Sequence, residues 1–204
     1  MRILSPVVGP RANPLAIGDV ELLRGGLVGP QAVRGDSLGA AVALHQLLQD
    51  LQCCSLVAPL ADDWVVGGKD DDVLYGDGGA DLVLGNLGAD TCDGGVSADT
   101  VRGGQGDYSL TGGDGDDRLS GDLGGDTLSG GAGADIFHSF GEAGFDRVVD
   151  FNRAEGDRVH LDPGTTYTVS QAGADVVMNM AGGAQMVLIG VQLSALTGDW
   201  IFTG

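Results

Sequence analysis

The stretch GGKDDDVLYGDGGADLVLGNLGADTCDGGVSADTVRGGQGDYSLTGGDGDDRLSGDLGGDTLSGGAGADIFH, residues 67–138, divides into eight units of nine residues without a gap. Every unit begins with Gly, and its eighth position is always apolar. The sixth position is Asp in seven of the eight units and Tyr108 in the remaining one. Self-similarity at a short fixed period is typical of stacked repeats. The period therefore predicts a solenoid.

Each unit has the composition of a turn followed by a short strand. Positions seven to nine favour a strand whose middle residue points inward, because side chains alternate across a strand. The six residues before it form a turn, where glycine supplies positive φ and close backbone approach. We therefore expect an all-β fold, a parallel β-roll in which two units make one coil. Four coils span roughly 19 Å at normal strand spacing.

Because two units make one coil, alternate units stack and their sixth positions form two columns. The first stack consists of Asp72, Asp90, Tyr108 and Asp126. The second stack consists of Asp81, Asp99, Asp117 and Asp135. Residues 58–66 keep the same register, with Asp63 sixth and Val65 eighth, but lack the glycines, so they read as an atypical capping unit.

Stacked carboxylates repel one another, so columns of Asp need a counter-charge. Calcium accepts six to eight oxygen ligands, which carboxylates and backbone carbonyls can both supply. Ordinary hydrophilic turns are the plainer alternative, because Asp is common in turns. The candidate metal-binding carboxylates are Asp72, Asp81, Asp90, Asp99, Asp117, Asp126 and Asp135. The candidate carbonyl ligands are those of Gly68, Gly79, Gly88, Gly95, Gly104, Gly106, Gly113, Gly115, Gly124 and Gly133.

These units resemble the hemolysin-type, or RTX, calcium-binding repeat. The resemblance extends over residues 67–138 and implies several bound Ca²⁺ ions, which we expect to number about four to six. One small apolar residue per unit makes a thin core. We therefore expect the repeats to fold only when the ions are bound.

The sequence changes character at residue 139. Phe145–Phe151 and Gly156–Leu161 resemble the segment that follows the repeats in serralysin-type proteases. Strand patterns at 167–170, 175–180 and 185–191 predict hairpins that cap the open end of the roll. Asp199-Trp200-Ile201-Phe202 resembles the terminal motif for type I secretion, and a last edge strand is the alternative interpretation. We expect residues 139–204 to be the cap and secretion region, and 58–138 to be the β-roll.

Residues 1–57 are predicted to form a short N-terminal segment with one helix, from Asp36 or Ser37 to about Gln52. Gly35-Asp36-Ser37-Leu38-Gly39 fits the G-x-S-x-G pattern and resembles the nucleophile elbow of lipases. A helix N-cap explains Ser37 equally well. The segment before the roll is also too short for the wide sheet of an α/β-hydrolase. No H-E-x-x-H motif occurs, which excludes a zinc protease of the serralysin type.

The composition of the chain narrows the classes of partner that it can bind. The chain carries 29 acidic and 10 basic residues, a net charge of −19, which disfavours nucleic acid as a partner. No apolar run is long enough to span a bilayer. Its N-terminus makes a poor secretory signal, so we expect export by a type I exporter and an extracellular location. The first function hypothesis is a secreted calcium-binding β-roll protein without catalysis, acting at a cell surface or in a matrix. The alternatives are a small or degenerate hydrolase using Ser37, or an auxiliary module that binds polysaccharide.

Overall fold

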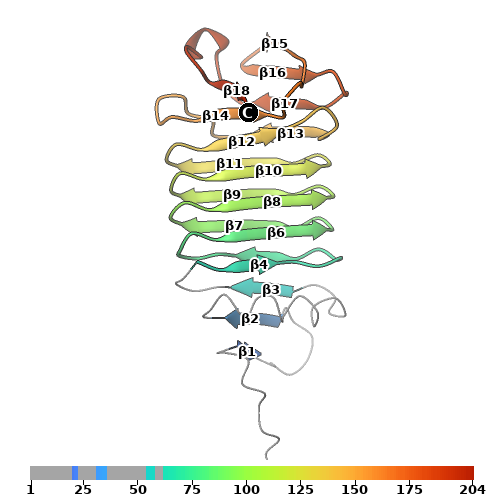
Figure 1. Ribbon diagram of the computed structural model, residues 1–204, viewed down its shortest axis with the longest axis vertical. Helices are drawn as coiled ribbons and strands as arrows, with labels where there is room; N and C mark the ends of the chain where they lie inside the picture. The colour runs from blue at the N-terminus through green and yellow to red at the C-terminus, as the bar shows by residue number, and fades with distance from the viewer. Residues whose placement is uncertain (1–19, 23–30, 36–53, 58–61) are drawn as a thin grey trace, which may run out of the picture.

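The computed structural model describes residues 20–22, 31–35, 54–57 and 62–204, and these form two sheets that face each other (Figure 1). Sheet A contains, in spatial order, β1 (Val20–Leu22), β2 (Gln31–Gly35), β3 (Cys54–Val57), β5 (Val73–Tyr75), β7 (Thr91–Val96), β9 (Ser109–Asp114), β11 (Thr127–Ala132), β13 (Phe145–Val148), β17 (Gln185–Leu188), β16 (Asp175–Met180) and β15 (Tyr167–Ala172). Sheet B contains β18 (Ile201–Thr203), β14 (Arg158–Leu161), β12 (Ile136–Ser139), β10 (Arg118–Leu123), β8 (Thr100–Gln105), β6 (Leu82–Leu87) and β4 (Trp64–Val66).

Successive units alternate between the two sheets. Leu119 on β10 lies beside Val101 on β8, and Leu128 on β11 lies beside Leu110 on β9, in parallel pairing. The partners in each pair are two units apart in the sequence. The register confirms the predicted parallel β-roll with two units in each coil (Figure 1).

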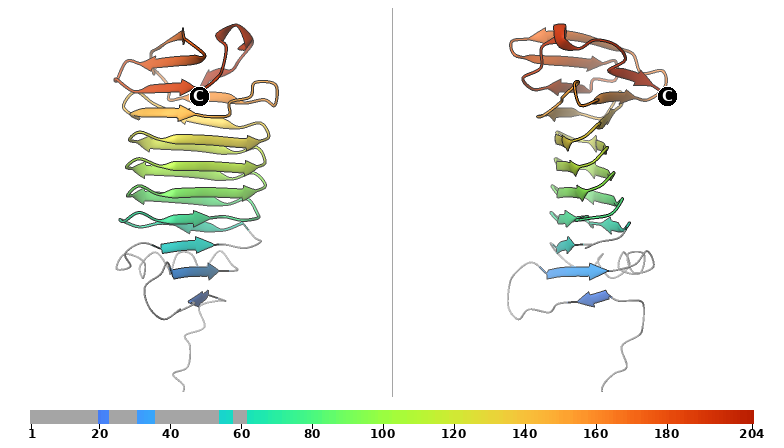
Figure 2. Two further views of the ribbon diagram at one scale, coloured as in Figure 1. Left: turned by 180° about the vertical axis from the view of Figure 1, so that it is seen from behind. Right: turned by 90° about the vertical axis from the view of Figure 1, so that its left-hand side faces the viewer.

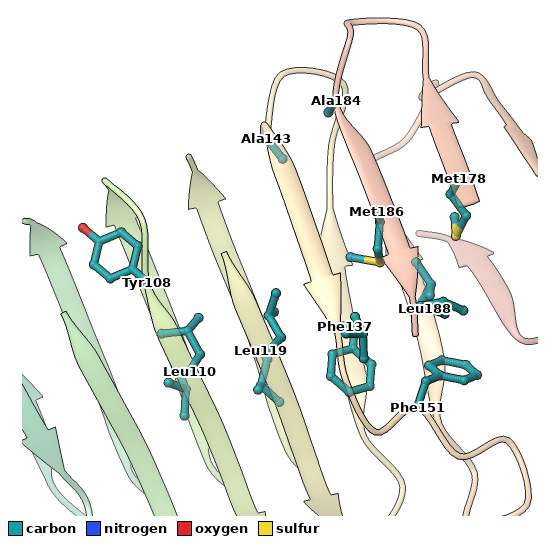
Figure 3. Packing of buried hydrophobic residues seen from close by; sticks show 14 of the residues in the cluster. Tyr108, Leu110, Leu119, Phe137, Ala143, Phe151, Met178, Ala184, Met186 and Leu188 are labelled. Carbon is teal, nitrogen blue, oxygen red and sulfur yellow. The ribbon is translucent and has the colours of Figure 1, made fainter. Parts of the chain in front are cut away.

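The core is a single file of side chains between the sheets. All eight apolar residues at position eight are at most 1% exposed: Leu74, Val83, Cys92, Val101, Leu110, Leu119, Leu128 and Phe137. Figure 3 shows Leu110, Leu119 and Phe137 pointing into this interior, with Tyr108 among them. Strands β6 to β11 are six residues long, longer than the predicted three, and each includes one or two glycines of the following unit. One apolar residue per unit therefore supplies most of the core of the roll.

Both sheets continue beyond residue 138. Strand β13 pairs with β11 and β14 pairs with β12, both in parallel, and β17 and β18 follow them. The spacing there changes, because Leu128 lies beside Val148 and Phe137 beside Val159, and both pairs are more than two units apart in the sequence. The connections after β12 and β13 are thus longer than a repeat turn, while the stacking of strands is kept.

The predicted C-terminal hairpins are present. Strands β15, β16 and β17 pair antiparallel and end sheet A. Met178, Met186 and Leu188 are fully buried and give this part a larger core than a repeat coil has (Figure 3). The strands here widen the column, as the side view in Figure 2 shows. A short 3₁₀ helix, Leu193–Ala195, precedes β18.

At the other end, strands β1, β2 and β3 extend sheet A, with β2 parallel to β3 and β3 parallel to β5. The sequence had suggested no strand at 31–35 or 54–57. The predicted helix and Ser37 lie outside the described residues. Among the described residues, no helix is long and apolar enough to cross a membrane.

Candidate metal sites

The two Asp columns lie at the two edges of the roll. The first stack stands at the turns that lead from sheet B into sheet A, immediately before β5, β7, β9 and β11. The second stack stands at the opposite turns, immediately before β4, β6, β8, β10 and β12, and includes Asp63. The fold thus separates the candidate carboxylates into the two columns that the sequence predicted.

Within each column, one carboxylate oxygen is used to join the coils. At most steps of each column, the backbone N–H of one Asp donates to Oδ1 of the Asp that lies one coil further on. Six such hydrogen bonds, 2.7–3.0 Å long, link Asp63 to Asp81, Asp72 to Asp90, Asp81 to Asp99, Asp99 to Asp117, Asp117 to Asp135, and Asp135 to Asp157. The same bond runs from Tyr108 to Asp126 at 2.8 Å. This ladder fixes the orientation of each carboxyl group whose Oδ1 accepts such a bond.

The second carboxylate oxygen is turned into the roll. Oδ2 of five stacked Asp residues is buried and has no hydrogen-bond partner among the described residues: Asp81, Asp90, Asp99, Asp117 and Asp135. An ionised oxygen without a partner is costly to bury, because desolvation is not compensated. A row of such oxygens is the arrangement in which a bound cation supplies the missing interaction.

The first glycine of each unit makes room for this oxygen. A Cβ atom at Gly94 would lie 2.7 Å from Oδ2 of Asp99, and one at Gly85 would lie 2.6 Å from Oδ2 of Asp90. Equivalent overlaps with the sixth-position Asp of the same unit occur at Gly76, Gly112, Gly121 and Gly130. At Gly76, Gly85, Gly94 and Gly112, the carbonyl oxygen of the first glycine one coil further on occupies the same space. The first glycine is therefore explained by the carboxylate together with this backbone carbonyl.

The buried stacks bind protons more tightly than ordinary carboxyl groups. Burial, opposed by the backbone hydrogen bond and reinforced by neighbouring Asp charges, raises the pKa of Asp117 to about 7. The same causes raise the pKa of Asp81, Asp90 and Asp135 to about 6. Burial also raises the pKa of Asp99. A divalent cation would reverse these shifts, because it favours the ionised form.

Many of the predicted carbonyl ligands line the same turns. A Cβ on the glycine two units later would overlap the carbonyl oxygen of Gly88, Gly95, Gly106, Gly113 and Gly115, so successive turns are in close backbone contact. The carbonyls of Gly68 and Gly124 accept hydrogen bonds from Leu87 and Phe145. Gly79, Gly104 and Gly133 have the positive φ of the same turn conformation.

Tyr108 takes the place of a carboxylate in the first stack. It is 3% exposed, and its ring lies against Gly103 and Gly85, where the neighbouring coils place Oδ2 of an Asp. Its hydroxyl donates to the carbonyl of Asn86 at 2.8 Å. Burial raises the pKa of the Tyr108 phenol, which keeps the hydroxyl neutral. A direct hydrogen bond therefore joins these two coils.

Two further Asp residues extend the columns and were missed by the sequence reasoning. Asp157 continues the second stack through its bond to Asp135, and Asp146 continues the first stack beside Asp126. Burial first, and then the adjacent Asp126, raise the pKa of Asp146 to about 8. The signal was the Asp-Arg-Val triplet at 146–148 and 157–159, which repeats the sixth to eighth positions of a unit.

Within residues 62–204, no cluster of three or more Asp, Glu, His or Cys side chains that could hold a metal ion is present. Calcium accepts backbone carbonyls and does not need such a cluster. The buried Oδ2 atoms without a hydrogen-bond partner are hard oxygen donors of the kind that a divalent cation such as calcium accepts.

A family model matches the repeats that form this geometry. The family described as RTX calcium-binding nonapeptide repeat (4 copies) matches residues 60–92, 93–128 and 111–148. No curated protein sequence matches the chain. Similar solved structures include the extracellular lipase LipA from Serratia marcescens, at 17% identity and a TM-score of 0.38. That match covers 76% of this chain and 41% of the lipase, so the chain spans less than half of the lipase's length.

A second similar structure is the AlgE6R3 subunit of the mannuronan C5-epimerase from Azotobacter vinelandii, at 24% identity and a TM-score of 0.29. It covers 70% of this chain and 78% of the subunit. Both the repeat pattern and the family match fall on the stacked coils that carry the Asp columns. The chain therefore carries RTX calcium-binding nonapeptide repeats over residues 60–148, and these repeats are folded as a parallel β-roll.

Proposed function

We propose that this calcium-binding β-roll protein is exported unfolded by a type I exporter and folds outside the cell when calcium fills the two Asp stacks. The observation that carries the proposal is the row of buried, unpartnered Oδ2 atoms along the described part of the roll. The ligands proposed are the stacked carboxylates, now including Asp146 and Asp157, with the carbonyls of the turn glycines. Calcium would supply positive charge to a core that is otherwise thin and strongly acidic.

Calcium concentration would act as the switch. Sites of extracellular modules have dissociation constants of about 10⁻⁴–10⁻³ M, far above cytosolic free calcium. The chain would therefore stay unfolded during synthesis and export, and fold where calcium is abundant. Once folded, it would be stabilised by every bound ion, because unfolding must release them all.

Residues 139–204 are proposed to serve as cap and export region, following the β-roll at 58–138 and the N-terminal segment at 1–57. The terminal Asp199–Phe202 motif has a structural role as well, because β18 pairs with β14 in sheet B. Trp200 is 8% exposed, and its carbonyl accepts a hydrogen bond from Val159 at 2.7 Å. The motif is thus positioned to close sheet B after export.

The test is secretion of the full chain and of a chain lacking residues 199–204 in cells that carry a matching type I exporter. We expect the truncated chain to stay in the cells, while the purified truncated chain still binds calcium through the Asp stacks. Val96→Ala, at an exposed position on β7 of the β-roll, is the control and should be exported normally. Undiminished secretion of the truncated chain would contradict the export role.

A further inference from the structure

The outer face of sheet B carries a cluster of basic side chains. Position nine of each unit points away from the core, and Arg102, Ser120, His138 and His160 are neighbours in register on β8, β10, β12 and β14. Arg118, at position seven of β10, stands beside this row. These side chains line a hollow of about 240 Å³ together with Thr100. No carboxylate of the described residues lines it, although 26 of the 204 residues are Asp.

Two of the basic groups are held in place from outside the hollow. The Arg102 guanidinium binds both carboxylate oxygens of Asp122, at 3.0 and 2.8 Å. Nε2 of His138 lies 3.0 Å from Asp162, and its Nδ1 lies 3.2 Å from the Ser120 hydroxyl. Both Asp residues belong to the lining of an adjacent hollow. The acids therefore orient the basic groups without occupying the space between them.

Arg118 has neither an ion pair nor a side-chain hydrogen bond among the described residues, although it is exposed on a strongly acidic protein. Its guanidinium presents several N–H donors in a fixed plane, which suits an oxyanion. The free guanidinium is the natural first contact for an anion entering this hollow.

His160 lies in surroundings that lower the pKa of its ring. Its ring lies between His138, at a centroid distance of 5.0 Å, and Phe202 on β18, at 4.7 Å. Burial lowers the pKa of His160, the charges of His138 and Arg118 lower it further, and Asp162 opposes them. Gly204 lies on the Nε2 side of the ring. An anion bound beside His160 would therefore offset the positive charges of His138 and Arg118.

We propose that this hollow is a binding site for a tetrahedral dianionic oxyanion, a sulfate or phosphate group, with Arg118, Arg102, His138 and His160 as its ligands. The net charge of −19 opposes anion binding, but charges beyond about 8 Å are screened at physiological ionic strength. Calcium bound in the stacks would reduce that charge further. The site belongs to the folded, calcium-loaded chain and does not depend on where the protein is secreted.

The test is NMR titration of the calcium-saturated, untagged full chain with sodium sulfate, which stays dissolved at millimolar calcium where phosphate would precipitate. The histidine ring signals are assigned with His138→Gln and His160→Gln. We expect saturable shifts at His138 and His160 and a raised pKa of His160. Sodium chloride at equal ionic strength should produce neither effect, and acetate should bind more weakly than sulfate.

Arg118→Gln should weaken sulfate binding about fivefold, the effect of one exposed charged contact. Arg118→Lys should weaken it less, and Arg147→Gln, exposed on sheet A, should leave it unchanged. Each variant is first shown to keep the calcium-dependent β-sheet signal. The proposal is overturned if chloride reproduces the shifts, if Arg118→Gln and Arg118→Lys both bind like wild type, or if acetate binds as tightly as sulfate.

Discussion

At the scale of single residues, the first glycine and the sixth aspartate of a unit form one structural pair. Oδ2 of the Asp fills the space in which a side chain at the glycine would lie, as at Gly94 and Asp99. Oδ1 meanwhile binds the preceding coil, as Asp99 does with the N–H of Asp81 at 2.7 Å. One side chain therefore serves both the coil contact and the candidate metal site.

This pairing predicts that Gly94→Ala is costly. The added methyl group would overlap both the Asp99 carboxylate and the carbonyl oxygen of Gly112 in the next coil, each 2.7 Å from the new Cβ. Overpacking of this kind costs about 1–3 kcal/mol of folding free energy. The matched control is Gly78→Ala, where the nearest atom to a new Cβ is 4.0 Å away. Chemical denaturation in calcium measures both. Equal stability of the two variants would show that the first glycine does not shape the site.

Replacing Tyr108 by Asp is expected to increase the number of calcium ions that the first stack binds. In Tyr108→Asp, the first stack would run without interruption from Asp90 to Asp126, so we expect up to two more calcium ions at saturation. Tyr108→Phe is the control: it loses the hydrogen bond to Asn86, at a cost of about 1 kcal/mol, and gains no ion. Calorimetric titration gives the stoichiometry. An unchanged ion count in Tyr108→Asp would mean that the aromatic ring does not occupy an ion position.

At the scale of elements, the sequence predicts the part of the fold in which the nine-residue period is kept. Position eight could be assigned to the core because alternation along a strand and the repeat frame agree. Asp146 and Asp157 could not be found by counting, because the connections before them are longer and the spacing between stacked strands exceeds two units. Ser139 also stands where the next unit would begin with glycine, directly after His138 at position nine.

Strands β2 and β3 were missed for a related reason. Strand β2 pairs in parallel with β3, and β3 pairs in parallel with β5. The sequences of β2 and β3 contain no glycine-rich turn and no sixth-position Asp. Their strand state depends on the edge that β5 offers, a tertiary effect that a local pattern does not reveal. The hairpin strands β15 and β16 were predictable, because alternation and intervening glycines are local signals.

The stacks also predict an unusual pH dependence. In the folded metal-free chain, Asp117 and Asp146 hold protons up to about pH 7 and 8, whereas unfolded Asp loses them near pH 4. Folding therefore takes up protons, and the metal-free fold should gain stability as the pH falls from about 8 to about 4. Calcium affinity should change the opposite way, because protons compete for the same oxygens.

Circular dichroism in resin-treated, calcium-free buffer checks this, because chelators weaken in acid. The β-sheet signal should increase as the pH falls. Asp146→Asn removes a carboxyl group whose pKa is raised to about 8, so the variant should lose the part of the change that lies above pH 7. A signal that is flat or that increases with pH would show that the buried carboxyl groups do not oppose folding.

At the scale of the whole molecule, charge and core size make the fold conditional. The roll buries one apolar side chain per unit, while the chain carries a net charge of −19. Repulsion within two columns of buried carboxylates opposes folding, and the thin core does little to offset it. Divalent ions between successive coils would remove the repulsion and cross-link the turns, so binding and folding would be one event.

A calcium titration of the full chain at neutral pH, followed by circular dichroism, tests this coupling most directly. In excess chelator, we expect residues 67–138 to be largely unfolded, and the β-sheet signal should appear cooperatively at about 10⁻⁴–10⁻³ M calcium. Magnesium at the same concentration is the control and should be far less effective, because it demands stricter octahedral geometry. A full β-sheet signal in excess chelator would contradict the account.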